Sequence, residues 1–131
     1  MKRPVLYMIS IRETIMDCDA EAPLSLLYVP APDGGTICVT VAGEIDMATA
    51  ERFRTGLDTA IDQHYQTVIV DLAGVRFMDS SGIAALMHAR NRAVAAAKTL
   101  YLVNCQPPVR RVMEISGVYA LLTDATPRTG W

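Results

Sequence analysis

Short apolar runs alternate with amphipathic stretches along most of the chain. Four of the runs are rich in β-branched or aromatic residues, which favours strands. The run at 67–72 is almost continuously apolar, as is typical of a strand buried on both faces of a sheet. The predicted strands are 24–29, 36–42, 67–72 and 100–104.

Between and after these strands, apolar residues recur at helical spacing. The spacing predicts helices at about 47–63, 81–97 and 107–115, and a short strand or helix at 119–122. Gly117 is expected to close the third helix. The apolar side of the first helix is expected to hold Phe53, Leu57, Ala60 and Ile61. That of the second is expected to hold Ile83, Leu86, Met87, Val94 and Ala97.

The order of these elements predicts one α/β domain with a mixed sheet of four to five strands and about four helices. A Pro, Gly and Asp-rich segment at 30–35 predicts a turn, so the sheet begins with a hairpin. The 131 residues are too few for two independent cores. We expect a domain at 23–125, an N-terminal extension at 1–22 and a C-terminal tail at 126–131.

Composition argues against several classes of function. The net charge is −2, so no strong basic field attracts nucleic acid. No apolar run approaches the ~20 residues of a membrane span, and no signal peptide is recognisable, so we expect a cytoplasmic protein. No metal-ligand or phosphate-loop motif occurs, and neither a metal nor a cofactor is expected. Cys18, Cys38 and Cys105 are expected to be reduced thiols, and a redox pair of Cys38 and Cys105 stays open.

Two polar segments follow predicted strands, where ligand and partner sites of such sheets gather. One is 43–46, Gly-Glu-Ile-Asp, and the other is 78–82, Met-Asp-Ser-Ser-Gly. Asp46 and Asp79 are candidate N-caps of the following helices. The two serine hydroxyls lie at a helix start, where backbone N–H groups and the helix dipole favour a phosphate. Simple capping is the competing interpretation.

Val-Asp-Leu at 70–72 with Phe-Met-Asp-Ser-Ser-Gly-Ile at 77–83 closely resembles the signature of STAS domains, in particular bacterial anti-sigma factor antagonists. The segment 43–46 resembles the other recurrent element of that family. The resemblance covers about residues 24–123 and implies the STAS fold. It also implies partner switching in transcription and stress responses. The unphosphorylated antagonist binds an anti-sigma factor that is also a serine kinase, and so frees the sigma factor. The kinase uses ATP to inactivate the antagonist, and a PP2C-type phosphatase restores it.

The same resemblance implies the site residues. The acceptor is the serine before the glycine, Ser81, with Ser80 as second choice. Met78 and Ile83 are candidates for apolar contact, although Ile83 is equally a core candidate. A phosphate in the interface would be desolvated or would face Asp46 and Asp79, at a cost of several kcal/mol. The expected partner-binding residues are Asp46, Met78, Asp79, Ser80, Ser81 and Gly82.

An enzyme is the first rival interpretation. Gly-x-Ser-x-Gly is absent, and His88 follows Ser81 by about 10 Å of helix, beyond the reach of a general base. His64 follows the first helix and is expected at the surface. A receiver domain needs an acidic cluster that Asp71 alone does not supply. A non-switching STAS interaction module in a stress-signalling assembly stays open, as does the oligomeric state.

Overall fold

The computed structural model describes residues 24–126, and these form one mixed four-stranded sheet in the order β1-β2-β3-β4. Strand β1 (Leu24–Pro30) pairs antiparallel with β2 (Thr36–Ile45). Strand β3 (Thr67–Met78) runs parallel to β2, and β4 (Thr99–Val103) runs parallel to β3. The predicted mixed sheet with an initial hairpin is therefore confirmed.

The turn between β1 and β2 is closed by the carboxylate of Asp33. It accepts hydrogen bonds from the Gly35 N–H at 2.8 Å and from the Thr36 hydroxyl at 3.0 Å. These bonds stabilise the charged form and hold the pKa of Asp33 below its ordinary value. The turn predicted from the Pro, Gly and Asp-rich segment is thus confirmed, and the local hydrogen bonds of Asp33 explain it.

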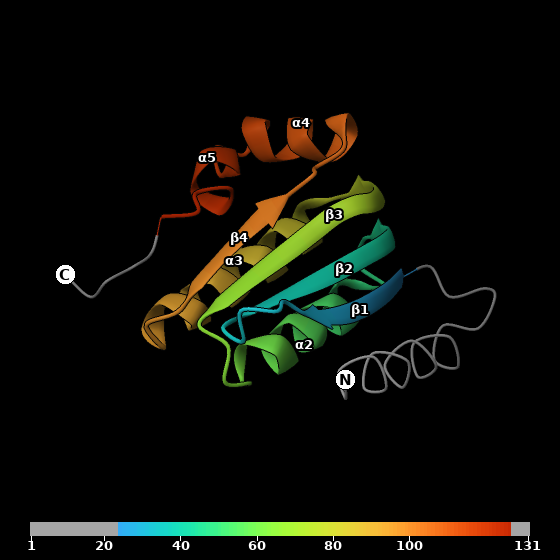
Figure 1. Cartoon of the computed structure of the whole chain (residues 1–131). Helices are drawn as coiled ribbons and strands as arrows, with labels where there is room; N and C mark the ends of the chain where they lie inside the picture. Colours follow the sequence, from blue (N-terminus) through green and yellow to red (C-terminus); the bar gives the residue numbers. More distant parts are fainter. Residues whose placement is uncertain (1–23, 127–131) are drawn as a thin grey trace.

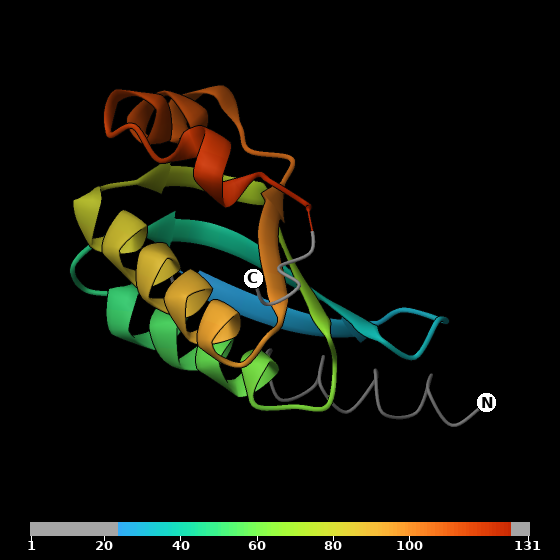
Figure 2. The ribbon, with the colours of Figure 1, turned by 90° about the vertical axis from the view of Figure 1, so that its left-hand side faces the viewer.

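Within the described residues, four helices accompany the sheet: α2 (Ala50–Ile61), α3 (Ser80–Ala95), α4 (Pro107–Ile115) and α5 (Tyr119–Leu122). Helices α2 and α3 lie side by side on one face of the sheet, as Figures 1 and 2 show from two directions. Helix α4 packs against β3 with Val109 and Met113 buried, and the short helix α5 contacts α4, α3 and β4. The segment predicted as a short strand or helix is the helix α5.

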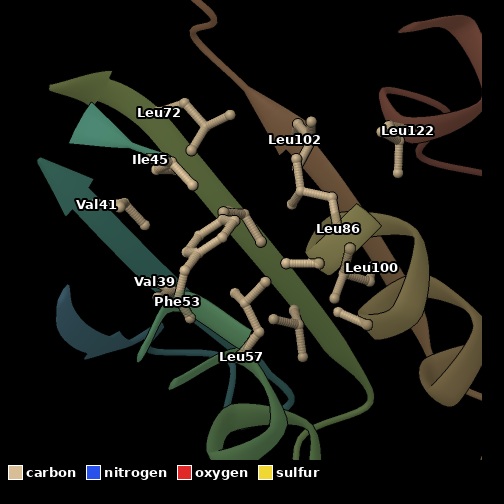
Figure 3. Packing of buried hydrophobic residues seen from close by; sticks show 14 of the residues in the cluster. Val39, Val41, Ile45, Phe53, Leu57, Leu72, Leu86, Leu100, Leu102 and Leu122 are labelled. Carbon is tan, nitrogen blue, oxygen red and sulfur yellow. The ribbon is translucent and has the colours of Figure 1, made fainter. Parts of the chain in front are cut away.

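The hydrophobic core fills the space between the sheet and the helices α2 and α3 (Figure 3). Alternate residues of the strands face it, among them Val39 and Val41 of β2. The apolar side predicted for the first helix is confirmed, because Phe53, Leu57, Ala60 and Ile61 are all buried. The period of the apolar residues therefore identifies correctly which face of α2 packs on the sheet.

Strands β2 and β3 both extend further than the sequence predicts. The strand predicted at 67–72 is too short, because residues 73–78 continue β3 beside the last residues of β2. Two register shifts, between Thr40 and Ala42 and between Gly43 and Glu44, let the pairing continue to Ile45 and Met78. Residues 73–78 form a strand because they pair with a segment distant in the sequence. Local preference does not predict this strand, because the segment contains glycine and arginine.

The helix ends also differ from their predictions. Helix α2 begins at Ala50 and not at 47, because a turn precedes it. Helix α3 ends at Ala95, and Ala97 adopts a left-handed φ of 60° that lets the Lys98 N–H reach the Ala93 carbonyl at 2.7 Å. Ala97 therefore lies outside the helix, and Val94 is 40% exposed, so these two parts of the predicted apolar side are wrong.

Helix α4 ends as predicted, since Gly117 has a φ of 79° and the next N–H bonds back to Met113. The N-terminal extension predicted at 1–22 lies outside the described residues, as does nearly all of the tail predicted at 126–131. The domain limits at 23 and 125 stay predictions.

Candidate partner-binding site

The two polar segments singled out in the sequence meet at one end of the sheet. Ile45 and Met78, the last residues of β2 and β3, are register partners. The Asp79 N–H donates a hydrogen bond to the Ile45 carbonyl at 3.1 Å. The loop after β2 and the first turn of α3 therefore lie next to each other. The expectation that both segments gather at the carboxyl ends of parallel strands is confirmed.

The loop after β2 is built around the side chain of Thr49. Its hydroxyl donates to the Glu44 carbonyl at 2.8 Å and accepts from the Asp46 N–H at 3.0 Å. Thr49 is 5% exposed and is itself the N-cap residue of α2. The prediction that Asp46 is this N-cap is wrong. The Asp46 carboxylate instead closes the turn before the helix by accepting the Ala48 N–H at 2.9 Å.

Thr49 was missed as a structural residue of the site. The signal that could have identified it is a hydroxyl residue directly before the amphipathic stretch of α2. That signal competed with Asp46, which is also a good capping residue and lies three positions earlier. Only the residue at which the helix begins in the structure shows which of the two is the N-cap.

Replacing Thr49 with valine is expected to lower the free energy of unfolding by about 1–3 kcal/mol, because the part-buried Glu44 carbonyl and Asp46 N–H lose their hydrogen bonds to the hydroxyl. Urea denaturation checks this value. The matched control is Thr59→Val on the exposed face of α2, where the hydroxyl bonds only to the Thr55 carbonyl. The control is expected to change stability by about 0.5 kcal/mol or less. Equal effects for both variants would contradict the role assigned to Thr49.

Asp79 caps the helix α3, as predicted. Its backbone is extended, and its carboxylate accepts the Ser81 N–H at 2.8 Å. Ser80 and Ser81 form the start of the first turn of α3, with Ser80 exposed and Ser81 half-buried. Neither serine hydroxyl hydrogen-bonds to another residue within 24–126. Both hydroxyls thus lie where the helix N-terminus favours negative charge.

Met78 and Gly82 pack the start of α3 closely against the ends of β2 and β3. Met78 is 1% exposed, and Gly82 is buried. A Cβ atom on Gly82 would lie 2.6 Å from Met78 Cγ and 2.7 Å from Ile45 Cγ2, so only glycine fits there without a shift. Ile83 is 8% exposed and belongs to the core. The surface apolar contact expected of Met78 and Ile83 is therefore not available in this structure.

Two apolar side chains that the sequence analysis did not single out are exposed at this end of the sheet. Met47 follows Asp46 and is 84% exposed, and Phe77 precedes Met78 and is 49% exposed. The alternation of a strand places Phe77 opposite the buried Met78. The sequence analysis did not use this alternation, because its predicted strand ends at residue 72.

Acidic groups dominate the charge of the site. Glu44, Asp46 and Asp79 come from the two segments, and one cation, Arg76, pairs with Glu44 at 3.1 Å. The Glu44–Arg76 pair is exposed on both sides, so it contributes little to stability. The surface around the serines is thus negative, with apolar side chains beside it.

Comparison with protein families identifies the fold. A family model described as STAS domain matches residues 30–128. The chain belongs to the STAS domain family. The STAS fold predicted from the two segments is thereby confirmed.

Individual relatives of this STAS domain carry related names. This chain is 34% identical over 92 residues to an anti-sigma F factor antagonist of Lysinibacillus sphaericus, and the match covers 70% of this chain and 79% of the relative. The anti-sigma factor antagonist SpoIIAA in its unphosphorylated form superposes with a TM-score of 0.64 at 30% identity, covering 78% and 89% of the two chains. The Bacillus cell fate determinant SpoIIAA in its phosphorylated form gives 0.59 at 27% identity, covering 76% and 89%. These relatives are regulatory proteins rather than enzymes.

The two histidines of the STAS domain are engaged away from the serines. His88 on α3 lies 3.7 Å from Asp58 of α2, next to Arg92, which pairs with Asp58 at 3.0 Å. His64 stacks on Tyr65 with ring centroids 4.1 Å apart. Neither arrangement brings an imidazole to Ser80 or Ser81 as a general base would require.

The cysteines of the STAS domain are too far apart for a native bridge. Cys38 pairs in register with Ile69 and, through it, with Tyr101, two strand spacings or about 10 Å away. Cys105 lies four residues beyond Tyr101 and is a free thiol, as is Cys38. A disulfide needs Cα atoms within about 7 Å, so the redox pair left open above does not form in this fold. Partial burial raises the pKa of both thiols and lowers their reactivity, and Cys18 lies outside the described residues.

Among residues 24–126, no helix has the length and apolar character needed to cross a membrane.

Proposed function

We propose that this protein is an anti-sigma factor antagonist that binds an anti-sigma factor serine kinase through the carboxyl ends of β2 and β3. Phosphorylation of Ser81, with Ser80 as second choice, switches it off, and a PP2C-type phosphatase restores it. It acts in the cytoplasm as a binding protein without catalytic activity of its own. The observation that carries the proposal is the pair of serine hydroxyls in the first turn of α3, beside the acidic loop after β2, neither of which hydrogen-bonds to another residue within 24–126.

The position of the serines favours a phosphoacceptor. A kinase needs a hydroxyl that it can reach, and neither serine hydroxyl is held by a hydrogen bond within 24–126. A phosphate at the start of α3 meets the positive end of the helix dipole, which favours negative charge. The modified protein therefore stays folded, and the change is confined to its surface.

The surroundings of the serines favour release of the partner after phosphorylation. A phosphoserine adds about −1.5 to −2 charges at neutral pH. Asp79 is already bonded to the Ser81 N–H, and Asp46 lies in the adjoining loop. A partner that closes over this surface must desolvate the dianion next to these carboxylates. The interface then loses several kcal/mol unless new cations compensate.

The choice between the two serines rests on different grounds. The resemblance of 77–83 to the family signature favours Ser81, which directly precedes Gly82. Exposure favours Ser80, since Ser81 is half-buried. We retain Ser81, because a kinase that binds over the α3 N-terminus would move the local side chains on contact.

The deciding experiment incubates the full chain with each anti-sigma kinase encoded in its own genome, with ATP and Mg²⁺, and maps phosphate by mass spectrometry. We expect one phosphate on Ser81, absent in Ser81→Ala. Ser116, exposed at the end of α4, is the matched control serine, and Ser116→Ala is expected to be modified normally. Phosphate on Ser80 keeps the mechanism and moves the site. Tight binding without any transfer would favour the non-switching STAS interaction module instead.

A further inference from the structure

Exposed large apolar side chains are few in this domain, and they are unevenly placed. Within residues 24–126 they are Met47, Phe77, Val94 and Ile115. Two of the four, Met47 and Phe77, lie at the carboxyl ends of β2 and β3. Met47 directly follows Asp46, and Phe77 pairs in register with Glu44. Single exposed apolar residues are common on protein surfaces, but two beside one candidate site call for an explanation.

We infer that Met47 and Phe77 are the apolar anchors through which the kinase partner gains most of its affinity for this chain. The inference rests on the proposed function and names the side chains that would determine which kinase binds. The partner's face would then carry an apolar pocket for each side chain, with basic groups opposite the acidic residues of the site.

Met47 is presented by a turn that is already ordered. The Asp46 carboxylate accepts the Ala48 N–H at 2.9 Å, so the turn closes around Met47 and leaves its side chain 84% exposed. The Thr49 hydroxyl stabilises the same turn through its hydrogen bonds to the Glu44 carbonyl and the Asp46 N–H. Preorganisation of this kind lowers the entropy that binding must remove.

Phe77 is the penultimate residue of strand β3. It pairs in register with Glu44, and the next pair, Ile45 with Met78, is buried. Alternation along the strand therefore keeps the Phe77 ring on the outer side, 49% exposed. Its backbone is held by the sheet, so its ring is also displayed from a rigid element.

These side chains have the chemistry of interface anchors. Aromatic residues and methionine are enriched in the cores of protein interfaces, where charged residues are depleted. The unbranched thioether of methionine adapts to pockets of different shape. An apolar anchor gains affinity only when water leaves its surroundings. A phosphate on Ser81 keeps its hydration, so the same event that adds charge would prevent these side chains from being buried.

The test compares Met47→Gln and Phe77→Thr with Ile115→Gln in the full chain. Ile115 is 77% exposed on α4, away from the serines, and is the matched control. The probe is the kinase that phosphorylates the wild-type chain. We expect Kd to rise about tenfold or more for Met47→Gln and for Phe77→Thr. Ile115→Gln is expected to stay within about twofold.

Kinetics of phosphorylation separate an anchor from a structural residue. Loss of an anchor raises KM for the antagonist and leaves kcat unchanged, because Ser81 itself is intact. The conservative variants Met47→Leu and Phe77→Tyr are expected to restore near-normal Kd. If Phe77→Thr lowers the thermal midpoint of unfolding, these conservative variants still show whether binding depends on the apolar side chain.

Each outcome has a distinct meaning. If the wild-type chain binds and is phosphorylated, but Met47→Gln and Phe77→Thr bind within twofold of it, the anchors are overturned and the proposed function stands. If the control Ile115→Gln weakens binding equally, the partner covers another surface and the anchors are also overturned. If no kinase binds or modifies the wild-type chain, the proposed function fails, and the anchors fail with it.

Discussion

The variant Ser81→Glu is expected to bind its anti-sigma factor kinase more than a hundredfold more weakly than the wild-type chain. A loss of about 3 kcal/mol suffices for this factor. The new carboxylate stands in the first turn of α3, next to Asp79 and beside the loop of Asp46. A close partner must remove water from it without a counter-charge in place. The measurement is Kd by calorimetry at fixed ionic strength.

Two controls separate the interface from the fold. Ser81→Ala is expected to keep its affinity, because it adds no charge. Thr59→Glu adds the same charge at an exposed position of α2 and is expected to bind normally. The fold of Ser81→Glu is expected to be intact, since a carboxylate near a helix N-terminus stabilises by about 0.3–1 kcal/mol. Unchanged tight binding of Ser81→Glu would contradict a phosphorylation switch at this serine.

The second large effect is expected in the core. Replacing Phe53 with alanine is expected to lower the free energy of unfolding by about 3–5 kcal/mol. Phe53 is 0% exposed and lies between α2 and the sheet (Figure 3). Its removal leaves a cavity that the surrounding leucine and valine side chains fill only in part. Urea denaturation followed by circular dichroism gives the value.

The chain offers a matched control, since it contains two phenylalanines and the other is Phe77. Phe77→Ala removes the same atoms from a side chain that is 49% exposed, and is expected to cost well under half as much stability. If Phe53→Ala is unfolded without urea, Phe53→Leu provides a measurable and smaller loss. Similar losses for the two alanine variants would contradict the burial assigned to Phe53.

The stretches predicted correctly from the sequence are those that local physics determines. The buried face of α2 follows from the period of Phe53, Leu57 and Ile61, because one helix face must leave water. The hairpin follows from the turn residues at 30–35, and the cap of α3 from Asp79. The two polar segments were placed together because parallel strands end at one edge of a sheet.

What the tertiary structure alone decided is non-local. The end of β3 forms a strand because the end of β2 pairs with it through two register shifts, and no local pattern in 73–78 reveals that partner. The same pairing turns Phe77 outward and buries Met78, which reverses the sequence-based choice of apolar contact. The place of Thr49 below the loop depends on carbonyl and N–H groups that only the folded backbone brings together. The sequence by itself thus determined the fold family and the candidate serines, whereas the surface around them was decided by contacts between distant strands.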